Sequence, residues 1–141
     1  MKIYADTSFL VSLYLPDRHS PHAEQRVAVK PELWFTPLHR AEWTHAIAQH
    51  VFRKEISAAQ AKRTHAELER DCRAGVWRET ELPEEAWTTC VELARRHGAR
   101  LGTRTLDSLH VASALELGAD TFWTFDERQS RLAAAEGLSA S

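Results

Sequence analysis

Four acidic side chains lie in or beside apolar segments of this chain: Asp6, Glu42, Asp107 and Asp126. Asp6 and Asp126 each follow a short run with strand-like composition, and the other two lie within amphipathic helical patterns. A charged group in apolar surroundings is costly unless something neutralises it. Hard divalent cations prefer oxygen ligands, so a pocket built from these four carboxylates would bind magnesium or manganese.

Such a pocket suits the hydrolysis of phosphodiester bonds. This reaction needs a nucleophilic water at neutral pH and stabilisation of the charge on the phosphate and leaving oxygens, and metal ions supply both. Thr124 could orient a metal-bound water, although strand threonines are common simply because they favour β-structure. Arg104 and Arg40 are candidates to hold phosphate, and Trp43, next to Glu42, is a candidate to stack on an RNA base.

Hydrophobic periodicity and Pro/Gly punctuation predict strands that alternate with helices. We expect strands at 2–5, 33–36, 76–79 and 121–125, and helices at 7–14, 21–29, 37–52, 57–75, 83–98, 105–115 and 127–136. Alternation of this kind predicts an α/β fold in which parallel strands are joined by right-handed crossovers. The segment 137–141 is expected to be a frayed end.

The predicted fold gathers the four acids. Parallel strands end at the same edge of a sheet, where open α/β folds place their sites. Asp6 and Asp126 follow two strands, Glu42 lies in the second turn of the helix that leaves another strand, and Asp107 lies in the first turn of its own helix. Each acid also has a simpler interpretation. The three aspartates stand near helix starts, where they could cap backbone N–H groups, and Glu42 could lie on a solvated helix face.

Length and composition exclude several classes of protein. A chain of 141 residues is expected to form one domain, and its formal net charge of −2 creates no global positive field for a polyanion. Cys72 and Cys90 lack metal-ligand spacing and give no sign of a disulfide framework, which favours a reducing cytoplasm.

The N-terminal segment imitates a secretory signal but fails as one. Its apolar stretch, 9–15, is preceded by Asp6, is closed by Pro16 and Asp17, and is followed by no small-residue cleavage site. No apolar run approaches the roughly 20 residues needed to span a bilayer. We therefore expect no membrane partner.

Four separated motifs together resemble the PIN-domain ribonucleases. These are Asp6-Thr7-Ser8 after the first strand, Glu42 in a mid-chain helix, the run from Arg104 to Ala112, and Thr124-Phe125-Asp126. Within that group the chain looks like the VapC toxins of bacterial toxin–antitoxin pairs. The resemblance covers nearly the whole chain, although each motif alone is weakly specific.

The resemblance implies a three-layer α/β/α fold and a Mg²⁺- or Mn²⁺-dependent endoribonuclease. It assigns the metal-binding acids to Asp6, Glu42, Asp107 and Asp126 and the small hydroxyl residue to Thr124. It also implies RNA as the substrate and a VapB-like antitoxin that blocks the site, and we expect a homodimer. One departure from the family is the short C-terminal segment, which leaves little room for the last strand that usually follows the final helix.

Other classes of site are weighed against this one. A zinc site could use His39, Glu42 and His45, but the two histidines are six residues apart and lean to opposite sides of a helix. His110 is expected to hydrogen-bond within its buried helix or to support Asp107. A covalent aspartyl phosphatase would need a second Asp where Ser8 stands, and a phosphate-cradling loop would need glycines after the first strand. A catalytically silent PIN module that only binds RNA or protein remains open.

Overall fold

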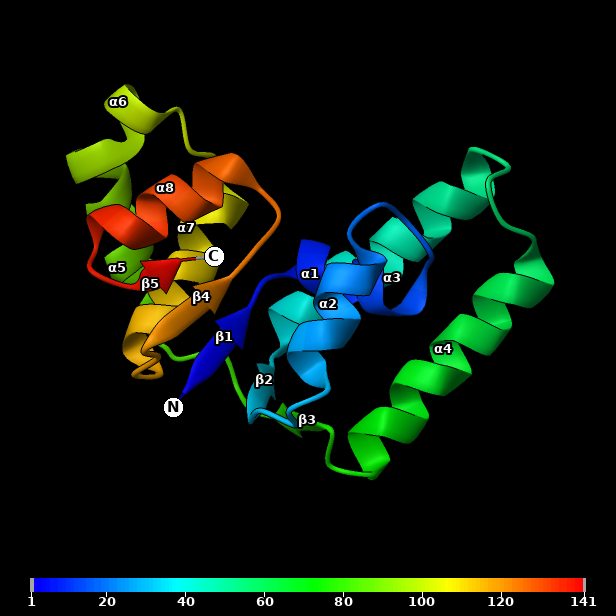
Figure 1. The fold of residues 1–141 in the computed structure, drawn as a ribbon. Helices are drawn as coiled ribbons and strands as arrows, with labels where there is room; N and C mark the ends of the chain where they lie inside the picture. The colour runs from blue at the N-terminus through cyan, green and yellow to red at the C-terminus, as the bar shows by residue number, and fades with distance from the viewer. Residues whose placement is uncertain (1, 141) are drawn as a thin grey trace.

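The computed structural model describes residues 2–140, and at its centre is a sheet of five short strands (Figure 1). Every neighbouring pair is parallel, and the spatial order is β3-β2-β1-β4-β5. The strands are β1 (Ile3–Ala5), β2 (Leu33–Phe35), β3 (Trp77–Glu79), β4 (Thr121–Trp123) and β5 (Ser139–Ala140). The parallel α/β prediction is therefore confirmed.

Helices connect the strands and cover both faces of the sheet, which gives the predicted three layers. They are α1 (Thr7–Tyr14), α2 (Ser20–Val27), α3 (Pro37–Phe52), α4 (Ala58–Arg73), α5 (Ala86–Leu93), the π-helical turn η1 (Ala94–Gly98), α6 (Ala99–Leu101), α7 (Thr105–Glu116) and α8 (Glu127–Ala135). Local sequence sets several of the starts. Thr36 and Ser57 begin α3 and α4 with capping boxes, and Pro37 occupies a first-turn position where no N–H is needed.

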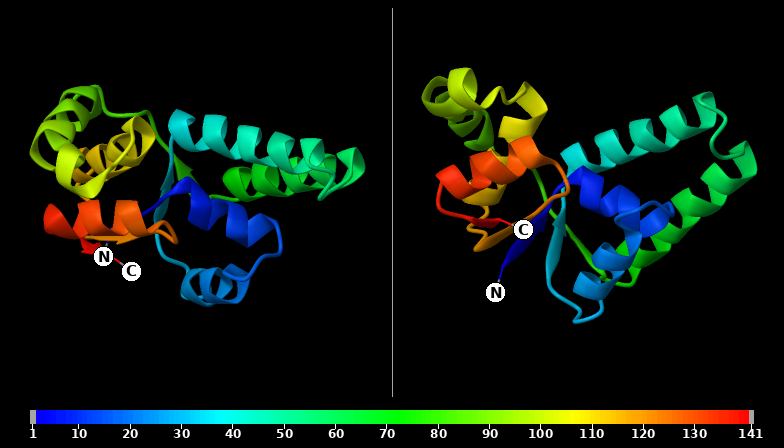
Figure 2. Two further views of the ribbon diagram at one scale, coloured as in Figure 1. Left: turned by 90° about the horizontal axis from the view of Figure 1, so that it is seen from above. Right: turned by 45° about the horizontal axis from the view of Figure 1, so that its top comes forward.

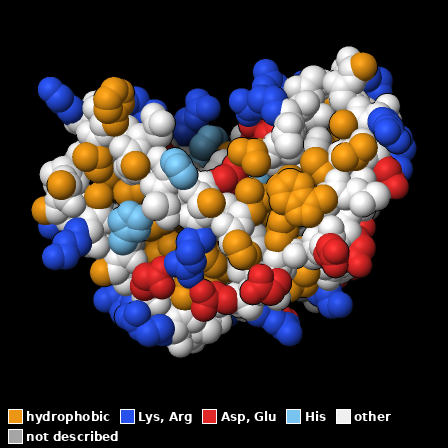
Figure 3. All heavy atoms as spheres, turned by 180° about the vertical axis from the view of Figure 1, so that it is seen from behind, with side chains coloured by type: hydrophobic (Ala, Val, Ile, Leu, Met, Phe, Trp, Pro, Cys, Tyr) orange, Lys and Arg blue, Asp and Glu red, His pale blue; other side chains and the backbone are white. Residues whose placement is uncertain are grey.

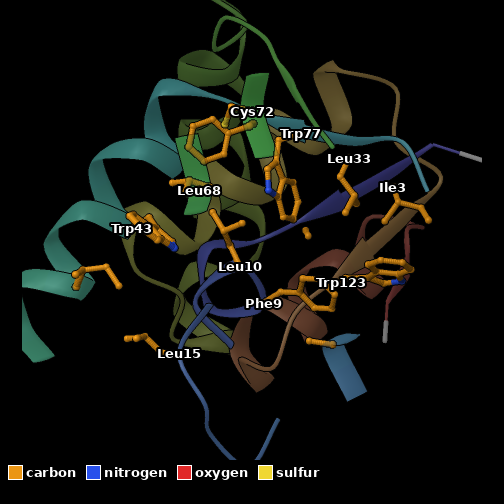
Figure 4. Close-up of a cluster of buried hydrophobic side chains, with 14 residues drawn as sticks. Ile3, Phe9, Leu10, Leu15, Leu33, Trp43, Leu68, Cys72, Trp77 and Trp123 are labelled. Atoms are coloured by element: carbon orange, nitrogen blue, oxygen red, sulfur yellow. The ribbon is translucent and has the colours of Figure 1, made fainter. Parts of the chain in front are cut away.

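Alternate strand residues supply two separate cores, because successive side chains of a strand point to opposite faces. On one face, Ile3 and Leu33 pack with residues of α1, α3 and α4 (Figure 4). Phe9 and Trp43 are fully buried in this cluster. Burying one such side chain contributes about 1.5–3 kcal/mol, so the cluster holds α1 and α3 firmly against the sheet.

The second core lies on the opposite face. Tyr4, Trp34 and Phe122 come from the intervening strand positions and pack against residues of α5, α7 and α8. Helix α7 is buried along most of its length, as its largely apolar circumference predicts. The consequence for function is that α7 can hold an acid deep in the protein with little freedom to move.

The helices of the two cores lie on different sides of the molecule, as the two turned views show (Figure 2). The α3–α4 hairpin projects to one side of the molecule, while α5 to α8 gather at the other. Within residues 2–140, no helix is long and apolar enough to cross a membrane. Cys72 and Cys90 are both free thiols, in agreement with the expectation of no disulfide.

Two predicted boundaries are wrong. Gly98 does not end the helix that follows Pro83, because its φ of −58° is helical and the chain continues to Leu101; Gly102, with φ of +67°, ends it instead. The frayed end expected at 137–141 is also wrong for the residues that the structure describes, since Ser139 and Ala140 pair with β4 as a fifth strand, and residue 141 lies outside the described part. The sheet therefore does carry the final strand that seemed to lack room.

Smaller shifts affect other elements. The strand predicted at 121–125 ends at Trp123, and the helix predicted at 21–29 covers Ser20–Val27. The first of these shifts matters for the site. It frees Thr124 and Phe125 from the sheet, so that both residues lie in the loop that leads to Asp126.

Candidate active site at the carboxyl edge of the sheet

The register of β1 and β4 brings the first pair of site residues together. Ala5 is paired with Trp123, so the next residues along each strand, Asp6 and Thr124, leave the sheet side by side. The Asp6 backbone N–H donates to the Trp123 carbonyl at 3.0 Å, and the Thr124 hydroxyl donates to Asp6 Oδ2 at 2.6 Å. The parallel register of β1 and β4 therefore brings these two side chains within contact distance.

Asp6 is fully buried and caps α1. Its Oδ1 accepts hydrogen bonds from the Ser8 hydroxyl at 2.7 Å and from the Phe9 backbone N–H at 3.0 Å. Burial raises the pKa of Asp6 above its usual value, and the charge of His110 and the three hydrogen bonds only partly offset that effect. A buried carboxylate of this kind is a group that a nearby cation would stabilise.

Glu42 comes from α3 and bridges to two other elements. Its Oε1 accepts from the Thr7 hydroxyl of α1 at 2.7 Å and pairs with Nε2 of His110 from α7. Burial alone would raise the pKa of Glu42, but the hydrogen bond and charge of His110, together with the Thr7 hydroxyl, hold it below its ordinary value. Glu42 is therefore ionised at neutral pH, with a side chain 24% exposed toward the pocket.

Asp107 and Asp126 approach from the other side. Asp107 Oδ2 accepts from the backbone N–H of Arg104 at 2.9 Å and from its Nε at 3.2 Å, which fixes the first turn of α7. Asp126 caps α8 by accepting from the Gln129 N–H at 3.0 Å, and its own N–H donates to Thr124 Oγ1 at 2.9 Å. The capping interpretation therefore holds for all three aspartates in this structure.

One pocket of about 500 Å³ brings three of the acids together at this edge. It is lined by Thr7, Ser8, Glu42, Arg104, Thr105, Leu106, Asp107, His110, Asp126 and Gln129. Asp6 lies behind this lining, and Ser8 is the residue that joins it to the surface. Seen from behind, the molecule is notched at its upper edge, and acidic side chains lie in the notch (Figure 3).

The carboxylates that line the pocket are of the right chemical type for a hard cation, but they are too far apart to bind one together as they stand. Within residues 2–140, no three His, Cys, Asp or Glu side chains form a group that could hold a metal ion as they stand. Among these described residues, however, Glu42 Oε2, Asp107 Oδ1 and Asp126 Oδ2 take part in no hydrogen bond. Three carboxylates that line one pocket, each with one oxygen available, are the ligands magnesium and manganese prefer. Metal binding at this edge would require the side chains to move closer together.

His110 connects the pocket to the sheet rather than supporting Asp107. Its Nδ1 lies 2.8 Å from the Tyr4 hydroxyl, and its Nε2 faces both Glu42 and the Thr7 hydroxyl, the latter at 3.2 Å. Tyr4 and His110 are almost completely buried. The expectation that His110 bonds within its own helix is therefore wrong. This buried polar chain sets the orientation of Glu42 from behind.

The geometry of His39 excludes it from a zinc site. Its Nε2 lies 2.8 Å from the Ala5 carbonyl, which can only accept, and its Nδ1 accepts the Thr36 backbone N–H at 3.0 Å. Both ring nitrogens are therefore occupied within the core. Burial and the nearby charge of His110 lower the pKa of His39 to about 3, and the bond to Ala5 only partly opposes this, so the ring is neutral. His45 is exposed on the outer side of α3.

Two of the three predicted substrate contacts lie elsewhere. Trp43 is fully buried between Tyr14 and His65 in the first core, so it offers no surface to a substrate. Arg40 forms ion pairs with Glu69 and Glu79 beside a different hollow. Only the third residue, Arg104, lines the acidic pocket.

Sequence reasoning missed three residues that complete the site. Thr7 and Ser8 support Glu42 and Asp6, and their positions directly after Asp6 were the available signal. Tyr4 belongs to the same network, but nothing in the sequence relates it to His110, which is 106 residues away. Its role follows only from the packing of α7 against β1.

The family model described as PIN domain matches residues 3–135. The chain belongs to the PIN domain family. A comparison with curated protein sequences gave no match.

Several solved structures share the fold of this chain. VapC20 from Mycobacterium tuberculosis, described as a sarcin-ricin loop cleaving toxin, is 19% identical with a TM-score of 0.70, over 96% of this chain and 95% of that one. FitAcB from Neisseria gonorrhoeae is 14% identical with a TM-score of 0.73, over 98% and 95%. VapBC2 from Rickettsia felis, solved with promoter DNA, is 16% identical with a TM-score of 0.68, over 100% and 98%.

Proposed function

We propose that this PIN domain is a Mg²⁺- or Mn²⁺-dependent endoribonuclease and the toxin of a toxin–antitoxin pair. The observation that carries the proposal is the convergence of Glu42, Asp107 and Asp126 on one pocket, with buried Asp6 directly behind it. Family membership and the fold shared with VapC20 support the same conclusion.

Each acidic residue of the site, and Thr124 beside them, would have a distinct role in the reaction. Glu42, Asp107 and Asp126 would hold the metal, and the charge of Asp6 would add to the negative potential beneath it. A bound magnesium or manganese ion supplies an activated water and neutralises charge that develops on the phosphate. Thr124 would act by holding Asp6 in place, since its hydroxyl hydrogen is donated to that carboxylate.

Arg104 is suited to hold the substrate phosphate. Its side chain is 67% exposed, and only its Nε is used in the contact with Asp107. The Nη atoms take part in no hydrogen bond within the described part of the chain, 2–140, so both can donate to a phosphate at the pocket mouth. Arg104 would therefore place the phosphate beside the acids.

The test is cleavage of a panel of structured RNAs by protein freed of any antitoxin, with and without manganese. We expect metal-dependent fragments that disappear in Asp107→Asn and Asp126→Asn. Glu127→Gln is the matched control, because Glu127 is the next residue along the chain and pairs with Arg131 outside the pocket. Cleavage that persists in both aspartate variants would contradict the proposal.

A catalytically silent RNA- or protein-binding module is the second candidate. One observation favours it, namely that no group of acids within residues 2–140 is spaced to hold a metal as it stands. Manganese titration distinguishes the two. A nuclease should gain thermal stability, about 2.7 kcal/mol at 100 times the dissociation constant, whereas a silent module should bind RNA with no metal effect.

For the partner, we propose a VapB-like antitoxin that places an Arg or Lys beside Glu42. The acidic pocket needs a compensating charge whenever metal is absent. VapBC2, which shares this fold, was solved as a complex on promoter DNA. Co-expression with the neighbouring small reading frame should give an inactive complex that Glu42→Gln weakens. Full cleavage activity in the co-purified pair would contradict this assignment.

We also propose a homodimer. Trp87 and Val91 lie one helical turn apart on α5 and are 56% and 51% exposed, which leaves an apolar face uncovered in the isolated chain. Light scattering coupled to size exclusion should give twice the 16.0 kDa mass of the chain. Trp87→Glu should convert it to a monomer, and a wild-type monomer at micromolar concentration would exclude the dimer.

A further inference from the structure

A second hollow of about 440 Å³ lies directly beside the acidic pocket. Thr7, Ser8, Glu42 and Asp126 line both cavities, so the two form one continuous surface around the acids. The second hollow extends from there toward the loop between α1 and α2, where His19 forms part of its wall. A polymer bound at the acids therefore has a path into this hollow.

Aromatic rings reach from the core to the wall of this hollow. Phe9 is fully buried and stacks on Phe125, with ring centroids 5.5 Å apart. Phe125 in turn stacks on His19, with centroids 4.2 Å apart and planes only 6° from parallel. His19 and Phe125 are both partly exposed. We call these three rings the aromatic column.

Helix capping does not explain the placement of His19. This residue precedes α2 at the N-cap position but makes no capping hydrogen bond with its side chain. Its backbone N–H is held by Asp17 Oδ1 at 2.7 Å, and its Nε2 accepts a hydrogen bond from exposed Arg18 at 3.2 Å. The loop thus holds the imidazole of His19 at the side of the hollow, with the guanidinium of Arg18 in contact with it.

We propose that the aromatic column is a stacking subsite for a base of the RNA strand. The proposal rests on the nuclease function proposed above and adds where the substrate binds. Single-stranded RNA is recognised by stacking of unpaired bases on Phe, Tyr, Trp or His rings. A nucleotide whose phosphate lies at the acids would place its base in the adjoining hollow against His19 and Phe125.

Polar and charged side chains around the hollow suit a nucleotide better than an apolar peptide side chain. Glu42 and Asp126 lie at its inner end, and Asp17 lines it near His19, with both carboxylate oxygens held by the Ser12 hydroxyl and the His19 N–H. Arg18 does not line the hollow but contacts His19 from outside it. A base stacked on the rings would have flanking phosphates that need cations, and Arg18 and a metal ion at the inner acids would supply them.

The subsite is testable with a short RNA that contains 2-aminopurine, whose fluorescence falls when it stacks. Binding is measured with manganese in an Asp107→Asn background, which prevents cleavage. We expect His19→Ala to weaken binding by about 5- to 150-fold, as loss of one stacked base does, and to restore fluorescence. His19→Tyr keeps a ring and should retain both binding and quenching.

Two controls make the result specific. Phe52→Ala removes an exposed aromatic ring at the end of α3, and Phe52 lines neither hollow, so this variant should leave binding unchanged. Phe125→Leu keeps apolar volume against Phe9 but removes the ring under His19, so it should weaken binding as His19→Ala does. With Asp107 intact, both column variants should raise KM for cleavage more than they lower kcat.

The outcomes separate this inference from the nuclease proposal. Metal-dependent cleavage with equal RNA affinity in wild type and His19→Ala would overturn the subsite and leave the nuclease function standing. A His19→Ala variant that binds RNA normally but loses the antitoxin would assign the hollow to protein docking and also overturn it. Absence of both RNA binding and cleavage in the wild type would overturn both proposals.

Discussion

Thr124 donates its hydroxyl hydrogen to Asp6 at 2.6 Å and at the same time accepts the backbone N–H of Asp126 at 2.9 Å. One buried side chain thus joins the acids that follow β1 and β4. Because its hydroxyl hydrogen is donated to Asp6 and Thr124 is not part of the pocket lining, we expect Thr124 to act by positioning the carboxylates. Its contribution to catalysis should therefore follow its contribution to local structure.

Replacement of Thr124 by Val tests this bridge. The substitution keeps shape but leaves Asp6 Oδ2 and the Asp126 N–H without their partner, which should lower the free energy of unfolding by about 1–3 kcal/mol. RNA cleavage should fall in parallel. Urea unfolding and a cleavage assay measure the two effects. Thr124→Ser, which keeps the hydroxyl, should stay close to wild type in both, and a Val variant with wild-type stability would show that the bridge is unimportant.

Asp6→Asn should fold, and without metal it should be at least as stable as the wild type at pH 7. Burial raises the pKa of Asp6, so the native state holds its proton more tightly than the unfolded chain does. Stability is therefore lost as pH rises from the unfolded value of 3.8 through the folded pKa, and ionised Asp6 is a net cost at neutral pH. Asn removes the charge and keeps an oxygen for the Phe9 N–H.

Thermal melts in EDTA and in millimolar manganese measure both parts of this prediction. Manganese should raise the melting temperature of the wild type and have less effect on Asp6→Asn. The control is Asp120→Asn, which removes an acid at the opposite end of β4, where Asp120 accepts the Lys2 N–H. Strong destabilisation of Asp6→Asn together with an unchanged manganese response would mean that Asp6 is only a helix cap.

The part of the site that follows from strand topology was predictable from sequence. Asp6 directly follows β1, and Asp126 follows β4 after two loop residues, so both lie at the shared edge of the parallel strands, where the sequence had placed them. Asp107 was placed correctly because the helix that carries it is apolar on most of its surface and had to be buried. These inferences need only periodicity and chain order.

Features that depend on the rotation of a helix or on contacts across the chain were not predictable. Trp43 and Glu42 are neighbours in sequence but project about 100° apart on α3, so one fills the core while the other faces the pocket. The β5 strand is only two residues long, too short for any periodicity to show. The pairing of His110 with Glu42 joins residues 68 positions apart, and only the packing of α3 against α7 reveals it.

The neutral ring of His39 predicts a pH-dependent stability. Folding lowers the pKa of His39 to about 3, so below its unfolded value of about 6.5 the unfolded chain binds a proton that the native state does not. The contribution of His39 to the free energy of unfolding should be fully present above pH 6.5. Below that pH it should fall as the pH decreases, by up to about 1.4 kcal/mol per pH unit. Urea unfolding between pH 5 and pH 8 measures the slope.

His39→Gln should be less stable at pH 7.5, because it breaks the link between Thr36 and Ala5, but its stability should change less between pH 5 and pH 6.5. His45→Gln is the matched control, since His45 lies on the same helix and is exposed. An unaltered slope in His39→Gln would show that another group causes the pH dependence.

The last prediction concerns the support of Glu42 by His110. His110 lowers the pKa of Glu42, so the pair contributes stability above about pH 4.5 that is lost as pH falls through the folded pKa of Glu42. His110→Ala should raise that pKa and lower the free energy of unfolding at pH 7 by about 1–3 kcal/mol, because the carboxylate loses a buried partner.

Tyr4→Phe is the control that distinguishes the two ring nitrogens of His110. It removes the hydrogen bond to Nδ1 at 2.8 Å and leaves the contact of Nε2 with Glu42 in place. Carboxyl-carbon NMR of Glu42 should therefore show a raised pKa in His110→Ala and little change in Tyr4→Phe. An identical titration in the wild type and His110→Ala would mean that Thr7 and the solvent, not His110, set the charge of Glu42.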